Sequence, residues 1–147
     1  MPKEKMYTLT VNEAQLANIQ DALEWFFRLQ MGQFFDYATT VAKCGYEYDK
    51  DDPDNERKFY EYIQRRDDAK ELLDKAFRIA QPTNCRQTED MMIAQDIWAD
   101  IRHFRWKERP EPKSHDTRDA WDPLHISGLT PVKIERAESK YRGKANG

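Results

Sequence analysis

Glycine and cysteine are scarce in this chain, and each shortage excludes a class of protein. Only five of the 147 residues are glycine, and neither G-x-G-x-x-G nor the Walker A pattern occurs. A glycine-rich phosphate-binding loop is therefore not expected. The two cysteines, Cys44 and Cys85, do not form a C-x-x-C pair, which argues against a disulfide framework or a cysteine-based zinc module.

Long apolar runs are also missing. The chain has no stretch of about 18 apolar residues, the length that a membrane helix needs, and the N-terminal MPKEKMYTL has no apolar signal core. We therefore expect neither membrane insertion nor secretion, and we predict a cytoplasmic protein.

Patterns that carry catalysis or bind metal do not occur either. The chain has no G-x-S-x-G, and the three histidines stand too far apart for a common zinc module. The acidic run at residues 47–56 fails as a calcium loop, because Asp54 stands where a glycine is needed and Tyr60 where a bidentate glutamate is needed. We predict a protein that is not an enzyme, with no catalytic residues, no metal and no cofactor.

The abundant residue type is the charged one. Charged residues make up 35% of the chain and hydrophobic residues only 39%, against roughly 25% and 45–50% in typical soluble domains. A chain of 147 residues fits one domain, which we place at residues 1–136, with a flexible polar tail at 137–147. The shortage of apolar residues favours a homo-oligomer, and the net charge of −3 makes nucleic-acid binding unlikely.

Periodicity and capping signals predict four helices, over residues 10–30, 33–43, 53–80 and 88–107. Thr10 and Glu13 match the T-x-x-E capping box at the first start, and Gly32 allows a break after it. Thr88, followed by two acidic residues, marks the start of the fourth helix. Arg66 and Lys70 fall inside the apolar stripe of the third helix, so each cation needs a partner or a route to water.

Apolar and polar residues alternate, as in a β-strand, in two short stretches: MYTLTV at residues 6–11 and LHISGLTPVKIE at residues 124–135. Each has the other as its simplest partner, which would tie the two ends of the chain together. The expected fold is therefore α+β and mainly helical, with a two-stranded antiparallel sheet that pairs the N- and C-terminal strands.

Aromatic residues are concentrated in EWFFRLQMGQFFDY, residues 24–37. Phe26, Phe27 and Phe34 fall on the core side of the first helix, whereas Trp25 lies opposite the core stripe and implies a second surface.

The fourth helix also has large side chains away from its core stripe, namely Arg102, Trp106 and Arg109. Arg and Trp are typical of protein interfaces, and they equally suit a phosphorylated, base-bearing ligand. Cations in a last helical turn also simply complement the helix dipole, so this reading stays open beside the other two.

The run LTVNEAQLANIQDALEWFFRLQMGQF, residues 9–34, resembles the opening of small phage and prophage proteins. Those proteins have a threonine-rich strand followed by a helix of the type IQDALEFYSRxGxGQF. Residues 19–24, Arg28 and residues 32–34 stand in the matching places, and IRH at 101–103, Trp106 and PVKIE at 131–135 are also similar. The chain departs from the pattern at Trp25–Phe27, where that group has a smaller, more polar run, and at Leu29–Met31.

Some proteins of this kind are Thoeris anti-defence proteins, which sequester a cyclic ADP-ribose-type signal in pockets between subunits. The resemblance therefore implies capture of a cyclic nucleotide without turnover. The candidate ligand-binding residues are Arg28, Gln33, Arg102, His103, Trp106, Arg109 and Trp25. Arginines would meet the phosphates and a tryptophan would stack on the base. The alternative is a phage accessory or inhibitor protein that binds a host protein through an exposed aromatic and arginine surface.

Overall fold

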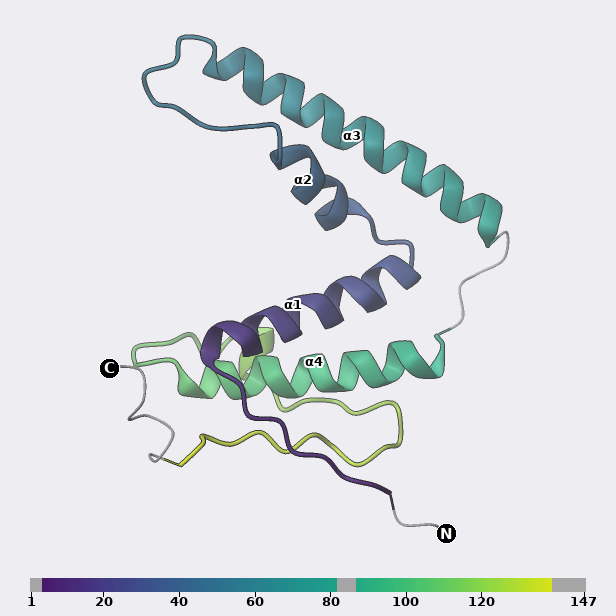
Figure 1. Ribbon diagram of the computed structural model, residues 1–147, viewed down its shortest axis with the longest axis vertical. Helices are drawn as coiled ribbons and strands as arrows, with labels where there is room; N and C mark the ends of the chain where they lie inside the picture. The colour runs from purple at the N-terminus through teal and green to yellow at the C-terminus, as the bar shows by residue number, and fades with distance from the viewer. Residues whose placement is uncertain (1–3, 82–86, 139–147) are drawn as a thin grey trace. The chain divides into compact units, whose positions relative to one another are not determined.

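The computed structural model describes residues 4–81 and 87–138. Over these residues the chain forms four α-helices and one 3-10 turn (Figure 1). The elements in order are α1 Glu13–Gln30, α2 Phe35–Lys43, α3 Asn55–Ala80, α4 Glu89–Glu108 and η1 Arg118–Ala120. The four predicted helices are confirmed, with boundaries that differ by at most a few residues.

The predicted two-stranded sheet is wrong, because neither of the two described ranges contains a strand and the fold is helical. Residues 6–11 and 124–135 run as extended or irregular chain without a backbone ladder. The Thr130 hydroxyl donates a hydrogen bond at 3.3 Å to the side chain of Glu4, two residues before the first of these stretches. The backbone amides of Ile126, Ser127 and Val132 instead donate to carboxylates of α4, so the apolar alternation did not indicate strand pairing.

The chain divides into two compact units. The first comprises residues 1–24 and 93–147, and the second comprises residues 25–92. Helices α1 and α4 each contribute to both. The single domain expected at residues 1–136 stays a prediction, and most of the tail expected at 137–147 lies outside the described residues.

The start of α1 shows how local chemistry defines a helix end. The amide of Gln15 donates to the side-chain oxygen of Asn12 at 2.8 Å, and the amide of Asn12 donates to the Gln15 side chain at 2.9 Å. This is a reciprocal capping box. It lies two residues later than the predicted pair Thr10 and Glu13, because the amide side chain of Gln15 replaces the expected glutamate.

The second unit is built around α2 and α3, which pack against each other. Tyr62 of α3 is buried and stacks on Tyr46, with ring centroids 5.2 Å apart. Phe34 meets Phe77 edge to face at 5.7 Å. The core positions predicted for Phe27 and Phe34 are confirmed, whereas Phe26 is 41% exposed and its predicted burial is wrong.

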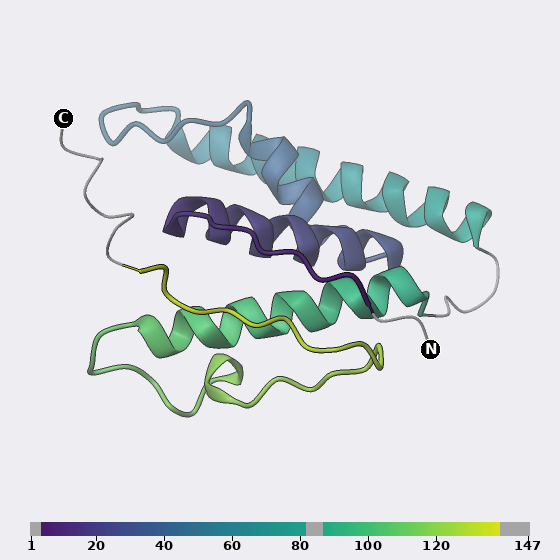
Figure 2. The same ribbon diagram turned by 60° about the horizontal axis from the view of Figure 1, so that its bottom comes forward.

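The first unit is built around α4, with α1 on one side and the chain after α4 on another (Figure 2). Arg105 donates to Glu13 and to Gln20 of α1 at 2.9 and 2.7 Å. We call residues 109–138 the C-terminal segment. Because α4 is covered on more than one side, it buries polar as well as apolar side chains, namely Ala94, Asp96, Ala99, Ile101, His103 and Trp106.

Among the described residues, no helix is both long enough and apolar enough to cross a membrane.

Candidate functional site

An open hollow on the second unit holds two of the predicted ligand-binding residues, Arg28 and Gln33. Its volume is about 410 Å³, within the range of roughly 300–1,000 Å³ that small-molecule sites occupy. We call it the Arg28 hollow. Its lining residues are Arg28, Gly32, Gln33, Phe34, Phe35, Asp36 and Lys70.

The turn at the end of α1 brings Arg28 and Gln33 together. The Gln33 amide donates to the Arg28 carbonyl and the Gly32 amide to the Leu29 carbonyl, at 2.9 and 3.1 Å. Gly32 has a φ of +76°. These three features define a Schellman motif, which terminates a helix with a left-handed glycine. The motif places residues 28 and 33 side by side, and the Arg28 guanidinium donates to the Gln33 side-chain oxygen at 2.8 Å.

Close packing makes Gly32 doubly constrained. A Cβ at this position would lie 2.8 Å from Cε1 of Phe77, which is shorter than any normal contact between carbon atoms. Glycine is therefore required both for the backbone conformation and for the approach of α3. The floor of the hollow depends on this residue.

Helix α3 supplies the second cation. The Lys70 ammonium donates to Asp74 one turn later at 2.8 Å, and its side chain is only partly exposed. One turn before it, the Arg66 guanidinium lies over the ring of Phe35, 5.0 Å from the centroid. The two cations that interrupt the apolar stripe of α3 thus have partners, as charge burial requires.

The charge balance of the hollow favours an anion. Its lining has two fixed cations, Arg28 and Lys70, and one carboxylate, Asp36. The Arg28–Asp36 pair is long, at 3.9 Å, and half of the Asp36 side chain is exposed. A phosphate that replaced Asp36 at the guanidinium would form shorter, charge-assisted hydrogen bonds.

The predicted residues on α4 are occupied by contacts within the protein. Trp106 is buried, and its indole N–H donates to the Ser114 carbonyl at 2.8 Å. His103 stacks on one side of the indole, and the Lys113 ammonium lies 4.6 Å from its ring centroid. The edge of the His115 ring completes the enclosure. Trp106 is therefore enclosed by the chain itself.

The polar groups around Trp106 bind the C-terminal segment. Asp119 pairs with both Arg102 and Arg109, at 3.4 and 3.6 Å, and the backbone carbonyl of Asp119 lies 2.9 Å from Nδ1 of buried His103. Arg102 also stacks on Trp98 at 4.3 Å. Burial lowers the pKa of Arg102, while the nearby Asp119 carboxylate opposes that shift. The guanidinium remains cationic at neutral pH.

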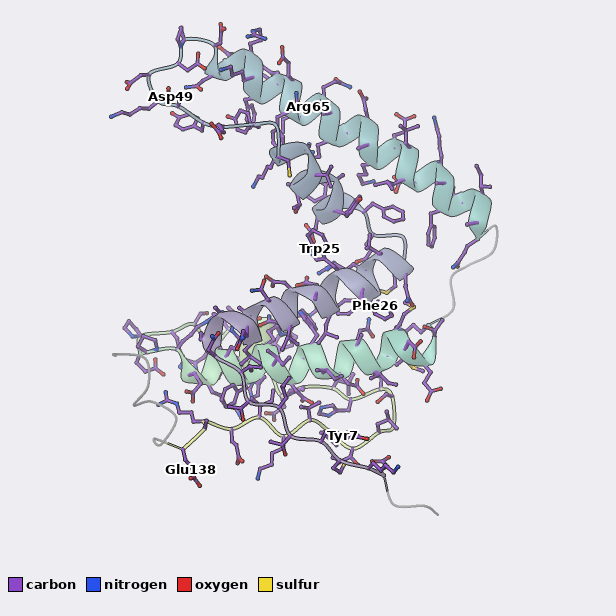
Figure 3. The ribbon with its side chains drawn as sticks, viewed as in Figure 1. Tyr7, Trp25, Phe26, Asp49, Arg65 and Glu138 are labelled. Carbon is purple, nitrogen blue, oxygen red and sulfur yellow. The ribbon has the colours of Figure 1, made fainter. Side chains whose placement is uncertain are left out.

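Trp25 has a contact partner of its own. Its ring meets Tyr37 edge to face at 6.0 Å, on the side of α1 that faces α2, and it is 36% exposed (Figure 3). The seven predicted residues thus form three sets: Arg28 with Gln33, Trp25 with Tyr37, and Arg102, His103 and Trp106 of α4 together with Arg109, the first residue after that helix. Trp25 does not line the Arg28 hollow.

Lys70 and Phe35 line the hollow but were not among the predicted site residues. A signal for Lys70 was present, because a cation inside the apolar stripe of α3 has to reach a polar environment. Phe35 had no comparable signal. It is the first residue of α2, directly after the core residue Phe34.

Asp96 and Asp100 of α4 also carry structural roles that the sequence did not indicate. Buried Asp96 accepts hydrogen bonds from the amide and hydroxyl of Ser127 and from the amide of Ile126. Burial alone would raise the pKa of Asp96, but these three bonds together hold it below its ordinary value. Asp100 accepts a bond from His125 at 2.7 Å.

A second hollow of about 450 Å³ lies between α3 and the chain after α2. Cations of both hollows are paired: Arg57 contacts Asp54 and Glu61, and Lys58 contacts Asp52 in the second hollow, while Lys70 contacts Asp74 in the Arg28 hollow. The Arg28–Asp36 pair is the long one, at 3.9 Å, and we therefore favour the Arg28 hollow for an anion. Within residues 4–81 and 87–138, no three His, Cys, Asp or Glu side chains gather to hold a metal ion.

No protein-family model, no curated protein and no solved structure matches this chain.

Proposed function

We propose that this protein binds a small phosphorylated nucleotide in the Arg28 hollow and releases it unchanged. The observation that carries the proposal is the convergence of Arg28, Gln33, Phe35 and Lys70 on one open hollow of suitable volume. In this role Arg28 binds a phosphate through its planar guanidinium, and Lys70 adds a second positive charge.

The remaining lining residues suit the rest of such a ligand. Phe35 is 50% exposed and offers a ring on which a base stacks. Its other face carries the Arg66 guanidinium, which fixes the ring in place. Gln33 supplies both a donor and an acceptor for polar groups on the base or ribose.

The biological role follows from the resemblance to small phage proteins. The ligand is a cyclic nucleotide immune signal, of the cyclic ADP-ribose type or a cyclic oligonucleotide, and the protein sequesters it in the host cytoplasm as a homo-oligomer. Capture without turnover protects the phage for as long as the protein outnumbers the signal.

Thermal shift with a panel of cyclic nucleotides tests the proposal, since a ligand that binds the folded state raises the melting temperature. We expect one class of cyclic nucleotide to raise it, and heat to release that ligand with its mass unchanged. Arg28→Ala and Lys70→Ala should each remove the shift. Lys43→Ala, an exposed lysine in the last turn of α2, is the matched control and should keep it.

The Arg109→Ala variant distinguishes binding at the Arg28 hollow from binding beside Arg102, Trp106 and Arg109. Arg109 is exposed and pairs with Asp119, so the variant should fold and bind normally. If Arg109→Ala abolishes the thermal shift while Arg28→Ala preserves it, the ligand binds at α4 and the Arg28 hollow is not the site. No shift with any member of the panel would refute the nucleotide proposal.

A protein-binding role is the second candidate, and the apolar surface of the second unit favours it. Val41, Tyr60, Leu72 and Ile79 are all more than half exposed and offer apolar contact area to a partner. In this role the chain is an accessory or inhibitor protein that binds one host protein. A complex reconstituted from pure components should lose affinity with Val41→Asp and keep it with Arg28→Ala.

A further inference from the structure

The Arg28 hollow contains one acidic side chain, Asp36, beside its main cation. Asp36 lies in the first turn of α2, and its carboxylate is 3.9 Å from Nε of Arg28. A different nitrogen of the same guanidinium, Nη1, donates to Gln33 at 2.8 Å. A phosphate that binds Arg28 through Nε therefore has to displace the Asp36 carboxylate or lie next to it.

The cations of the hollow already have carboxylates close to them. Arg28 lies beside Asp36, and the Lys70 ammonium donates to Asp74 at 2.8 Å. When a ligand displaces Asp36 from Arg28, one carboxylate charge is exchanged for the charge of the ligand. A ligand group with a single negative charge leaves the charge balance at Arg28 unchanged. A second negative charge on that group adds an excess that the described lining residues do not offset.

The phosphates of nucleotides differ in this charge. A phosphodiester carries one negative charge, whereas a terminal phosphomonoester carries about two above its second pKa of about 6. We propose that Asp36 makes the Arg28 hollow select phosphodiesters, cyclic nucleotides among them, over terminal phosphomonoesters. This inference rests on the proposed nucleotide site, and it adds which phosphates that site accepts.

Asp36 determines specificity through repulsion, which grows in proportion to the charge of the phosphate. Its backbone belongs to α2, so a displaced carboxylate still ends close to the phosphate. The Asp36 side chain is 57% exposed, and solvent therefore screens much of this repulsion. For a partly exposed carboxylate we expect the second charge to weaken binding about three- to fivefold.

Isothermal titration calorimetry of the full chain at about pH 8 tests the proposal with two matched probes. Adenosine 5′-monophosphate and its phosphate methyl ester have the same base and ribose, and they differ by one negative charge. The natural sequence should bind the ester about three- to fivefold more tightly. Asp36→Asn should tighten binding of the monophosphate more than binding of the ester and thereby remove the preference.

Two further variants assign the effect to the charge of residue 36. Asp36→Glu keeps the carboxylate and should keep the preference for the ester. Asp51→Asn removes the same charge from an exposed residue that does not line the hollow, and it should also keep the preference. Circular dichroism should show the same helix content in all variants.

Three results would overturn the proposal: equal affinity of the natural sequence for the two probes, an unchanged preference in Asp36→Asn, or a lost preference in Asp51→Asn. Cyclic ADP-ribose, titrated alongside, separates this inference from the proposed function. Binding of cyclic ADP-ribose without binding of the ester would overturn the selectivity proposal and leave the nucleotide site standing. Failure of every nucleotide to bind would refute both.

Discussion

The Asp96 carboxylate on α4 accepts hydrogen bonds from both the amide and the hydroxyl of Ser127, 31 residues later in the chain. It also accepts the amide of Ile126 at 2.9 Å. One buried acid therefore satisfies two backbone donors that a sheet would otherwise satisfy. The C-terminal segment depends on side chains of α4 for its attachment.

Asp96→Ala should detach residues 126 and 127 from α4. Two amides and a hydroxyl lose their acceptor, and each unsatisfied buried group costs about 1–3 kcal/mol unless water reaches it. We expect the free energy of unfolding in urea to fall by at least that amount. Hydrogen exchange should speed up at the amides of Ile126 and Ser127. Asp21→Ala, an exposed acid of α1, is the control and should change neither measurement.

The stability that Asp96 contributes should depend on pH. Because its hydrogen bonds lower the pKa of Asp96 in the folded protein below the ordinary value of 3.8, the contribution is complete above that value. It is lost as the pH falls through the lower pKa of the folded state. The difference in unfolding free energy between the natural sequence and Asp96→Asn should shrink below about pH 4. A difference that stays constant down to strongly acidic pH would contradict this account.

Gly32→Ala should destabilise the second unit for two reasons. The left-handed backbone costs a residue with a Cβ about 1–2 kcal/mol, and the new Cβ would press on the Phe77 ring. Gly128 separates these effects, because it has a φ of +75° but open space around it. We therefore expect Gly32→Ala to lower the unfolding free energy by more than Gly128→Ala. Equal losses would mean that the Phe77 ring moves aside freely.

Trp106→Ala should act on folding, because the chain itself encloses this side chain. Loss of a buried tryptophan costs about 3–5 kcal/mol, and the Ser114 carbonyl loses its donor. Trp121, which is 63% exposed, is the matched control, and its replacement by alanine should stay within about 0.5 kcal/mol. Thermal and urea unfolding measure both. A Trp106→Ala protein with normal stability would show that the indole is not part of the core.

The helices were predictable because their signals are local. Thr88 accepts the Met91 amide at the start of α4, and the apolar stripe of α3 has the helical period along its whole length. The capping box of α1 was misplaced by two residues, because an Asn and Gln pair is chemically equivalent to the expected Thr and Glu pair.

The sheet could not be predicted correctly, because alternation alone does not identify the hydrogen-bond partner. Apolar and polar residues alternate over residues 124–135, yet the amides of Ile126, Ser127 and Val132 donate to acids of α4. These acids, Asp96 and Asp100, looked like ordinary solvated residues of a helix surface. A lone acid on a helix has the same sequence signal whether it faces water or a distant amide.

The candidate site was predictable in part. Arg28 and Gln33 flank the Gly32 break, so the chain itself brings them together. Lys70 comes from a helix that lies about 40 residues later, and only packing of α3 on this turn adds it. The α4 residues have the composition of an interface, and they form one, although the surface that they meet is their own C-terminal segment.

Attachment by side chains gives the C-terminal segment a different sensitivity to substitution from that of a strand in a sheet. A backbone ladder is nearly indifferent to residue type, whereas here Asp96, Asp100, Arg102 and Trp106 each secure a separate stretch. One substitution on α4 can therefore release a few residues of the C-terminal segment, while the hydrogen bonds and ion pairs that hold the neighbouring residues stay intact. Selection can adjust the mobility of each stretch independently of the rest of the fold.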